Sequence, residues 1–352
     1  MRIALIKSSS MGDVIHALPV VSDLVAARPG IEIDWVVEEA FADLPRLHPA
    51  VAQIHPVAVR RWRRTPLAAS VRAEVGAVAD RLRARRYDLA LDLQGLIKSA
   101  WLARLCGAPV AGFAWGSARE PLATLAYARR HPVPHDLHAI ERLRRLAGLA
   151  LGYAPQGLPV FGLSVPPRPL AWCPARPYAV LLQATSRPAK QWPAPNWIAV
   201  AQALLARGVS VVMPWGSAAE QAQAQAVAEA VAEAVGQARK PATGQGGEPG
   251  VGPGLQHKAA QMVVAPRLTL AECAALLAGA RAVVGVDTGL THLAAALSVP
   301  TVALFAATPG WRFGPYWSDC ATALGEAGVW PSPPQVLQTL ARLAGEPGWA
   351  SA

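Results

Sequence analysis

Cysteine is scarce in this 352-residue chain, and its four cysteines lie far apart without a CxxC pair. A disulfide framework, a zinc site and a redox pair therefore have little support. No apolar run approaches the ~18–20 residues needed to span a bilayer. The apolar segment of the N-terminal MRIALIKSSS is too short for a signal-peptide core and is typical of a first strand. We expect a cytoplasmic protein with free thiols.

Acidic residues are outnumbered, so that the formal net charge is +10. The charge is uneven, because residues 1–165 hold 21 Lys and Arg against 14 Asp and Glu, a net charge of +7. A basic first half indicates a polyanionic partner: nucleic acid, an acidic lipid headgroup or a phosphorylated sugar. Charge alone does not choose among these three.

Strand and helix patterns alternate along the chain, which predicts βαβ units with right-handed crossovers in parallel sheets. Strands are predicted at 2–7, 31–37, 89–93, 178–182, 209–213 and 282–286. Helices are predicted at 14–27, 67–86, 196–206, 218–235, 270–278, 290–297 and 334–344, with another that carries Lys98 and Trp101. Pro19 fits its helix only in or near the first turn. Neither half contains GxGxxG, which disfavours a nicotinamide or flavin enzyme.

The length exceeds that of a single hydrophobic core, so two domains are expected. Five prolines without periodicity at 164–177 mark the break between them. We predict Rossmann-like domains at 1–165 and 178–333, a linker at 166–177, a C-terminal helix within 334–352, and a flexible Gly-rich insertion at 236–262. The predicted class is α/β, with two parallel sheets on either side of a cleft.

The stretch RAVVGVDTGLTHLAAAL (281–297) is the most informative. A buried strand ends at Asp287-Thr288-Gly289, and a helix that includes His292 follows. Ligands bind at the carboxyl ends of parallel strands, and a helix N-terminus suits a phosphate that Gly289 lets approach closely. The alternative is that Asp287 or Thr288 only caps the helix.

Three further loops carry candidate residues. In SSSMGD, Asp13 lies near a helix N-terminus as an ionised base, or alternatively as an ordinary capping residue. In QATSRPAKQW, Lys190 could neutralise a departing diphosphate. Glu220 could bind ribose hydroxyls or could be a first-turn acid.

Arginine is concentrated in VRRWRR (59–64), and Arg119 lies in the same half. Such a cluster fits nucleic acid, phosphosugars or anionic membranes, although a charge run is often only a solvated surface. His16 and His48 are expected to be structural.

These motifs resemble, in order and over nearly the whole chain, those of the heptosyltransferases of lipopolysaccharide inner-core assembly. The matching stretches are KSSSMGDVIHALP (7–19), DWVVEEAF (34–41), PVAVRRWRR (56–64), LDLQGLIKSA (91–100), AREPLA (118–123), ATSRPAKQWP (184–193), PWGSAAE (214–220) and VDTGLTHLAAAL (286–297). RRWRR together with AREP points to the group that adds the first heptose rather than the second.

The resemblance implies the GT-B fold and an inverting, metal-independent glycosyltransferase without a cofactor. It would move L-glycero-D-manno-heptose from ADP-L-glycero-D-manno-heptose to a Kdo residue of Kdo2-lipid A. The missing DxD pair supports metal independence weakly. A monomer is expected on the cytoplasmic face of the inner membrane, in peripheral contact with its anionic surface and without a nucleic-acid partner.

The resemblance also implies roles for individual residues. Asp13 is the expected catalytic base. The expected donor-binding residues are Thr185, Ser186, Lys190, Glu220, Leu268, Asp287, Thr288, Gly289 and His292. The expected acceptor-binding residues are Ser10, Gly12, Arg60, Arg61, Arg63, Gln94, Lys98 and Arg119. Ser186 stands where a second threonine is expected, a change that keeps the hydroxyl group.

Other functions remain open from the residues alone. An enzyme of the second-heptose type would use a different acceptor. A nucleotide-sugar epimerase of the same fold would need acid and base groups at the donor carbon and no anionic acceptor site. A non-catalytic binder of nucleic acid or acidic lipid would use VRRWRR and would not need Asp13.

Overall fold

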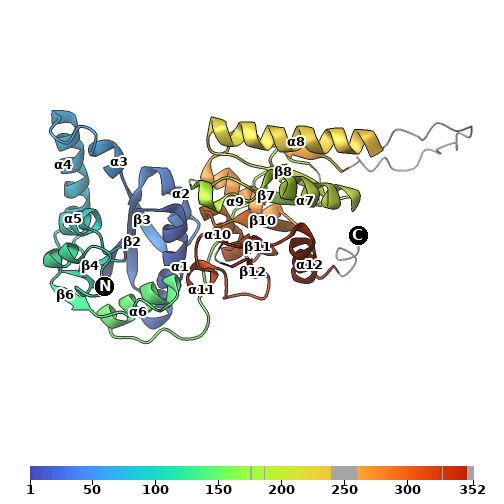
Figure 1. Ribbon diagram of the computed structural model, residues 1–352. Helices are drawn as coiled ribbons and strands as arrows, with labels where there is room; N and C mark the ends of the chain where they lie inside the picture. Colours follow the sequence, from blue (N-terminus) through green and yellow to red (C-terminus); the bar gives the residue numbers. More distant parts are fainter. Residues whose placement is uncertain (175–176, 186, 239–259, 327, 347–352) are drawn as a thin grey trace, which may run out of the picture. The chain divides into compact units, whose positions relative to one another are not determined.

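The computed structural model describes residues 1–174, 177–185, 187–238, 260–326 and 328–346 (Figure 1). The chain divides into two compact units. The first unit comprises Met1–Pro166 with Trp311–Phe313, and the second comprises Pro167–Gly310 with Gly314–Ala352. Most of the predicted Gly-rich insertion, residues 239–259, lies outside the described residues.

The first unit is a six-stranded parallel sheet with the strand order β3-β2-β1-β4-β5-β6. Its strands are β1 (Arg2–Ile6), β2 (Glu32–Glu38), β3 (Val51–Val57), β4 (Leu89–Asp92), β5 (Val110–Phe113) and β6 (Arg129–His131). Its helices are α1 (Met11–Ala27), α2 (Asp43–Arg46), α3 (Val59–Trp62), α4 (Ala69–Ala84), α5 (Ile97–Leu105) and α6 (Ala139–Leu151), with 3-10 helices η1 (Glu39–Phe41) and η2 (Pro121–Ala126).

The central strand β1 is apolar on both sides because helices cover both faces of its sheet. Ala4 and Ile6 pack in one core with Leu82 of α4 and Leu102 of α5. The opposite face is covered by α1, which packs against α6 (Figure 1). Successive side chains of a strand point to opposite faces, so the run RIALI supplies both cores.

The second unit repeats this arrangement with the strand order β12-β11-β10-β7-β8-β9. Its strands are β7 (Tyr178–Leu182), β8 (Ser210–Met213), β9 (Met262–Val264), β10 (Ala282–Val286), β11 (Thr301–Leu304) and β12 (Ala321–Leu324). Its helices are α7 (Ala194–Ala206), α8 (Ala218–Ala238), α9 (Leu270–Gly279), α10 (Gly289–Ala296) and α12 (Pro333–Leu343), with the 3-10 helix η3 (Pro188–Lys190). The short helix α11 (Gly310–Phe313) lies where the chain passes between the units.

Each sheet has one position where the direction of the chain connections reverses. In the first sheet β1 lies between β2 and β4, and in the second β7 lies between β8 and β10. Loops that leave neighbouring strands in opposite directions open a crevice at the carboxyl ends of those strands. The loops after β1 and β4, and those after β7 and β10, are therefore where a site is expected.

The α/β class with two parallel sheets is confirmed, but three local predictions were wrong. Helix α1 begins at Met11, so Pro19 lies in its middle. The proline ring removes one helical hydrogen bond there, but the helix continues because its middle is buried and packed on both sides of Pro19. Helix α8 continues to Ala238, because its Ala-rich and Gln-rich sequence has high helix propensity up to that point. Met262 belongs to β9 rather than to a flexible insertion.

A buried ionic network ties β2 to β3 and to the end of α4. The Asp34 carboxylate, which is fully buried, accepts hydrogen bonds from Arg85 Nε at 2.7 Å and from Tyr87 Oη at 2.8 Å. His55 Nε2 lies 3.4 Å from the same carboxylate. Burial raises the pKa of Asp34, but the bonds from His55, Arg85 and Tyr87 outweigh it and lower the pKa to about 2.

We expect Asp34→Asn to lower the free energy of unfolding by about 2–4 kcal/mol, because it removes the buried negative charge to which Arg85 and Tyr87 donate hydrogen bonds. A carboxylate with a lowered folded-state pKa stabilises the fold above its unfolded-state pKa and loses this contribution as the pH falls through the folded-state value. The difference from wild type should therefore be full at about pH 7 and shrink between about pH 4 and 2. Thermal unfolding across this range measures it.

The matched control is Asp80→Asn on α4, whose side chain is 81% exposed. It should change the unfolding temperature little at any pH. Equal effects of the two substitutions would contradict a stabilising role for the Asp34 network.

Candidate active site

Asp13 lies in the first turn of α1, after the loop that leaves β1. Its Oδ2 accepts hydrogen bonds from the Ser10 N–H at 2.9 Å and from Ser10 Oγ at 2.7 Å. Its Oδ1 lies 3.7 Å from Lys7 Nζ, and the side chain is 39% exposed. The capping role and the candidate base are thus compatible, since one oxygen holds the helix start while the other remains within reach of a ligand.

The surroundings keep Asp13 ionised. Burial raises the pKa of Asp13, but the charge of Lys7 and the hydrogen bonds from Ser10 outweigh it and lower the pKa to about 2. A base this weak accepts a proton only from a hydroxyl that becomes acidic while its oxygen bonds to an electrophilic carbon. Such an environment suits nucleophilic attack by an alcohol.

The loop that carries Asp13 is braced by the loop after β4. Gln94 Oε1 accepts hydrogen bonds from the Ser8 N–H at 2.8 Å and from Ser8 Oγ at 2.9 Å. Lys98 Nζ, from the first turn of α5, donates to Ser9 Oγ at 2.8 Å. The structure therefore brings Ser10, Asp13, Gln94 and Lys98 together at the reversal point of the first sheet.

The brace depends on Asp92, which is fully buried at the end of β4. One oxygen accepts from the Gln94 N–H at 2.8 Å, and the other from Ser99 Oγ at 2.8 Å and Tyr127 Oη at 2.6 Å. Burial raises the pKa of Asp92, and these hydrogen bonds oppose the rise. Asp92 orients the backbone of Gln94 and the start of α5.

The three arginines of α3 and its end that are predicted to bind the acceptor differ in their surroundings. Helix α3 is fixed by Glu38, whose Oε1 accepts from the Arg60 N–H at 3.0 Å. Burial lowers the pKa of Lys98, and the charges of Arg60 and Arg63 lower it further while those of Glu38 and Asp13 oppose the shift, so both arginines act electrostatically on Lys98.

Arg61 instead makes two hydrogen bonds to Glu74, at 2.9 and 2.7 Å, and lies 3.5 Å from Glu39. Its guanidinium is therefore largely occupied by protein carboxylates. Of the predicted acceptor-binding arginines, it is the one least available to an anionic ligand in this structure.

Arg119 and Gly12 complete the predicted acceptor residues. Arg119 is exposed, and its backbone packs on Gly95, where an added Cβ would lie 3.4 Å from Arg119 N and 3.1 Å from Phe113 Cδ2. Gly95 also has a φ of +68°, so glycine is needed there for both reasons. Gly12 lies half-buried in the first turn of α1 beside Asp13.

In the second unit, the Asp287 carboxylate collects three partners. Lys190 Nζ forms an ion pair with Oδ2, Thr308 Oγ1 donates to the same oxygen at 2.5 Å, and His292 Nε2 lies 3.1 Å from Oδ1. Burial raises the pKa of Asp287, but hydrogen bonds from His292, Lys190 and Thr308 outweigh it and hold the pKa well below its usual range. The alternative, that Asp287 only caps α10, does not describe this arrangement.

Thr288 and Gly289 begin α10. Thr288 occupies the N-cap position, but its side chain makes no capping hydrogen bond. The helix sits close to the sheet because Gly285 of β10 has no side chain: a Cβ there would lie 2.2 Å from Thr291 Oγ1. This close packing holds the α10 N-terminus beside Asp287.

The remaining donor-binding candidates are less well gathered. Glu220 Oε2 accepts from the Gly216 N–H at 2.7 Å and the Ser217 N–H at 3.0 Å, as a first-turn acid does. Thr185 Oγ1 accepts a weak bond from the Arg187 N–H at 3.4 Å. Leu268 is half-buried before α9, and Ser186 lies outside the described residues.

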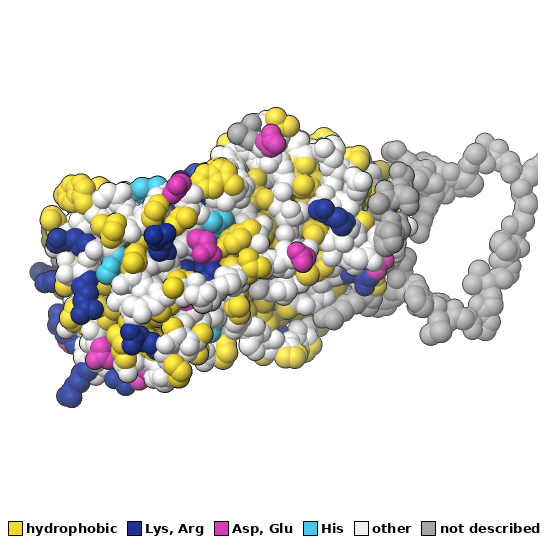
Figure 2. All heavy atoms as spheres, turned by 90° about the horizontal axis from the view of Figure 1, so that it is seen from below, with side chains coloured by type: hydrophobic (Ala, Val, Ile, Leu, Met, Phe, Trp, Pro, Cys, Tyr) yellow, Lys and Arg dark blue, Asp and Glu magenta, His cyan; other side chains and the backbone are white. Residues whose placement is uncertain are grey.

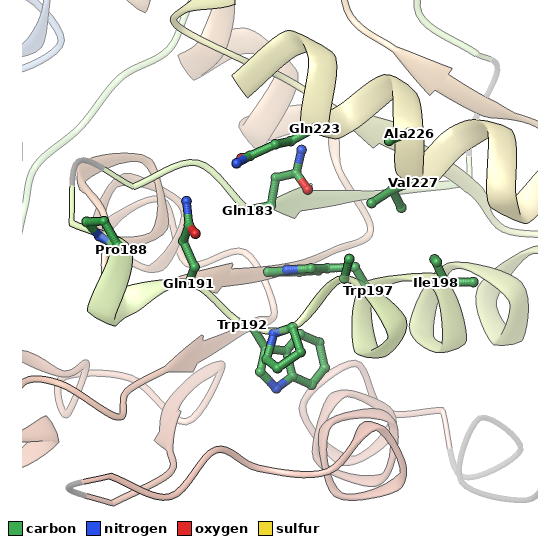
Figure 3. Close-up of a pocket in the computed structure, with 11 residues that line it drawn as sticks. Gln183, Pro188, Gln191, Trp192, Trp197, Ile198, Gln223, Ala226 and Val227 are labelled. Carbon is green, nitrogen blue, oxygen red and sulfur yellow. The ribbon is translucent and has the colours of Figure 1, made fainter. Parts of the chain in front are cut away.

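A pocket of about 410 Å³ lies beside this site, between η3, α7 and α8 (Figure 3). Gln183, Gln191 and Gln223 line it together with Trp192 and Trp197. None of the predicted donor-binding residues that the structure describes lines the pocket. Gln183 connects it to the site, since its Nε2 lies 3.5 Å from the Glu220 carbonyl oxygen.

Sequence reasoning gave no role to Lys7, Glu38, Asp92 or Thr308. Lys7 and Asp92 have a local signal, a charged residue at the carboxyl end of an apolar strand. Thr308 has none, because it meets Asp287 only through the pairing of β10 with β11. In the described part of the chain, no three His, Cys, Asp or Glu side chains gather as a metal site.

The family model of glycosyltransferase family 9 (heptosyltransferase) matches residues 75–238 and 251–342. The chain belongs to glycosyltransferase family 9. Over 315 residues it is 46% identical to lipopolysaccharide heptosyltransferase 1 of Pseudomonas aeruginosa, covering 88% of this chain and 80% of that protein. It is 39% identical over 318 residues to lipopolysaccharide heptosyltransferase 1 of Escherichia coli K12, covering 90% and 91%.

Among solved structures, E. coli heptosyltransferase WaaC with ADP matches this family 9 chain with a TM-score of 0.78 and 37% identity, over 93% of this chain and 94% of that one. The same protein with ADP-2-deoxy-2-fluoro heptose matches with a TM-score of 0.76. The predicted GT-B class and the prediction of a glycosyltransferase are confirmed.

Two buried tyrosines test whether the brace serves catalysis. Tyr127→Phe removes a bond to Asp92, and Tyr87→Phe removes a bond of the same kind to Asp34. Each should cost about 1–2 kcal/mol of stability. Only Tyr127→Phe should also lower kcat, by about 3–10-fold, because a small displacement of a catalytic group slows the chemical step.

Steady-state kinetics and thermal unfolding of both variants check this expectation. A kcat that falls equally in the two variants would mean that the loss follows stability rather than the position of the Asp13 loop.

Proposed function

We propose that this family 9 enzyme transfers L-glycero-D-manno-heptose from ADP-L-glycero-D-manno-heptose to a Kdo residue of Kdo2-lipid A, with inversion and without a metal. The carrying observation is that each sheet holds one charged cluster at its reversal point. The first contains the ionised Asp13 among basic residues, and the second contains Lys190 beside the α10 N-terminus. The likeness to lipopolysaccharide heptosyltransferase 1 supports the substrate class.

In the proposed reaction, the acceptor oxygen attacks the anomeric carbon from the side opposite the diphosphate. Asp13 takes the proton of the attacking hydroxyl. The bond between the anomeric carbon and the phosphate oxygen breaks, and ADP leaves with the electron pair. A single displacement of this kind inverts the configuration at that carbon.

The leaving diphosphate needs compensating positive charge. Lys190 supplies a full charge, and the N–H groups at the start of α10 supply a partial one. Asp287 holds Lys190 in place, with His292 on its second oxygen. The WaaC structures with ADP and with ADP-2-deoxy-2-fluoro heptose support an ADP-sugar as the donor.

The acceptor is an anionic glycolipid, which agrees with the excess of positive charge in the first unit. The charges of Arg60, Arg63 and Asp13 all act on Lys98. Arg119 is exposed beside Gly95. We place the enzyme, as a monomer, on the cytoplasmic face of the inner membrane, in contact with its anionic surface. No nucleic acid is involved in this proposal.

The direct test is transfer from ADP-heptose to Kdo2-lipid A by the purified protein, with and without a metal chelator. Product formation that survives chelation supports the proposal. A product whose new glycosidic bond has the same anomeric configuration as the donor would contradict inversion. Epimerisation of the nucleotide sugar without acceptor would favour the epimerase, and activity only on a heptosylated acceptor would favour the second-heptose type.

We expect Asp13→Asn to lower kcat by about 10²–10⁴-fold, because the amide cannot accept the proton. The amide oxygen can still accept from Ser10, so the unfolding temperature and acceptor binding should change little. Since the pKa of Asp13 is about 2, its protonation should not reduce the wild-type rate between about pH 7 and 5. Activity that is retained in Asp13→Asn would rule out this base.

Arg60 and Arg61 provide a matched pair for the acceptor. Arg60→Ala should raise the acceptor KM by about tenfold, since it removes a cation from the Asp13 neighbourhood. Arg61→Ala should raise it by less than about threefold, because Glu74 already occupies its guanidinium. A larger effect at Arg61, or an effect confined to the donor KM, would contradict these assignments.

A further inference from the structure

Four large apolar side chains are exposed on two adjoining elements of the first unit. Ile97 and Trp101 on α5 are 51% and 40% exposed, and Leu122 and Leu125 on η2 are 58% and 69% exposed. Residues four apart on an α-helix, or three apart on a 3-10 helix, lie on the same side of it. We call these four residues the α5–η2 surface.

The two elements form one continuous piece of the fold. Helix η2 packs against α5, and the Ile97 N–H donates to Glu120 Oε2 at 2.7 Å, immediately before η2 begins. Scattered exposed apolar residues are normal in soluble proteins, but a group on packed neighbouring elements marks an interaction surface. No helix among the described residues is long and apolar enough to cross a membrane, so contact through this surface would be peripheral.

Several arginines lie next to residues of the α5–η2 surface. Arg104 lies one turn beyond Trp101 on α5. The Trp101 ring also contacts the ring of Trp62, with 6.2 Å between the centroids, and Arg63 is the residue that follows Trp62. Arg130 Nε donates to the Thr124 carbonyl oxygen of η2 at 2.9 Å. Within the described residues, no ion pair with a carboxylate involves Arg63, Arg104, Arg119 or Arg130. Figure 2 shows Lys and Arg side chains with apolar ones between them at the end of the first unit.

We propose that the α5–η2 surface docks on an anionic phospholipid bilayer, with its apolar side chains in the headgroup region and its arginines on lipid phosphates. A tryptophan and aliphatic side chains rimmed by arginine fit a membrane interface better than a protein partner, which would be expected to offer carboxylates at fixed positions. This inference rests on the proposed function for its purpose, since it gives the enzyme a way to reach a lipid-anchored acceptor.

The surface adjoins the acceptor site. Ile97 belongs to the α5–η2 surface, while the next residue, Lys98, donates to Ser9 Oγ at 2.8 Å. A bilayer bound at α5 would therefore present its headgroups next to the loop that carries Asp13. Docking and acceptor binding would use neighbouring residues of one helix.

The test measures binding of the full-length protein to vesicles that contain no lipid A. Wild type should sediment with vesicles of phosphatidylcholine and phosphatidylglycerol, and less with phosphatidylcholine alone or at high salt. The double variant Leu122→Ser/Leu125→Ser should bind at least about tenfold more weakly. Its fold should persist, since both leucines are largely exposed.

The matched control is Leu149→Ser/Leu158→Ser, which changes two exposed leucines of α6 and the segment after it. Helix α6 packs with α1, on the sheet face opposite α5, so this variant should bind vesicles as wild type does. Equal binding by the two double variants, or no vesicle binding by wild type, would overturn the proposal.

Transfer to a water-soluble, deacylated acceptor separates docking from catalysis. Leu122→Ser/Leu125→Ser should keep this activity while losing activity on acceptor embedded in vesicles. Loss of both activities would assign the leucines to the acceptor site and overturn docking. Vesicle binding that depends on these leucines in a protein without heptosyl transfer would uphold docking and refute the proposed function.

Discussion

The parallel direction of the strands in both sheets is the constraint on which the site depends. Parallel strands need helical crossovers, so every loop at the carboxyl ends lies along the same edge of its sheet. The loops after β1 and β4 meet there in the first unit, and those after β7 and β10 meet in the second. Residues 86 positions apart, Ser8 and Gln94, become hydrogen-bonding neighbours at 2.8 Å as a result.

The charges at these edges are held by partners before any substrate arrives. Asp13 faces Lys7 and is bound by Ser10, and Lys190 is bound by Asp287. A partly buried charge without a partner would be costly, so each functional group has a local counterpart. In the proposed reaction, Lys190 shares its charge between Asp287 and the diphosphate, and Asp13 gives up its charge only when it takes the proton.

The sequence predicted much of this arrangement because its signals are local. Short apolar runs predicted β1, β7 and β10, and the polar residues after them located Asp13, Lys190 and Asp287. The family motifs added the expected roles. Local signals did not show that Pro19 lies in the middle of α1 or that Arg61 is occupied by Glu74, and they left open whether Glu220 bonds the start of α8. Those outcomes depend on how neighbouring elements pack.

The sequence by itself determined the α/β class, the membership of glycosyltransferase family 9, and the loops in which chemistry is expected. Periodicity and short motifs are properties of consecutive residues, so the chain displays them without being folded. The tertiary structure alone decided which side chains meet, such as Tyr127 with Asp92 and Thr308 with Asp287, and which apolar residues of α5 and η2 stay exposed. These contacts join distant segments, and only the strand order and the packing of helices on each sheet bring such segments together.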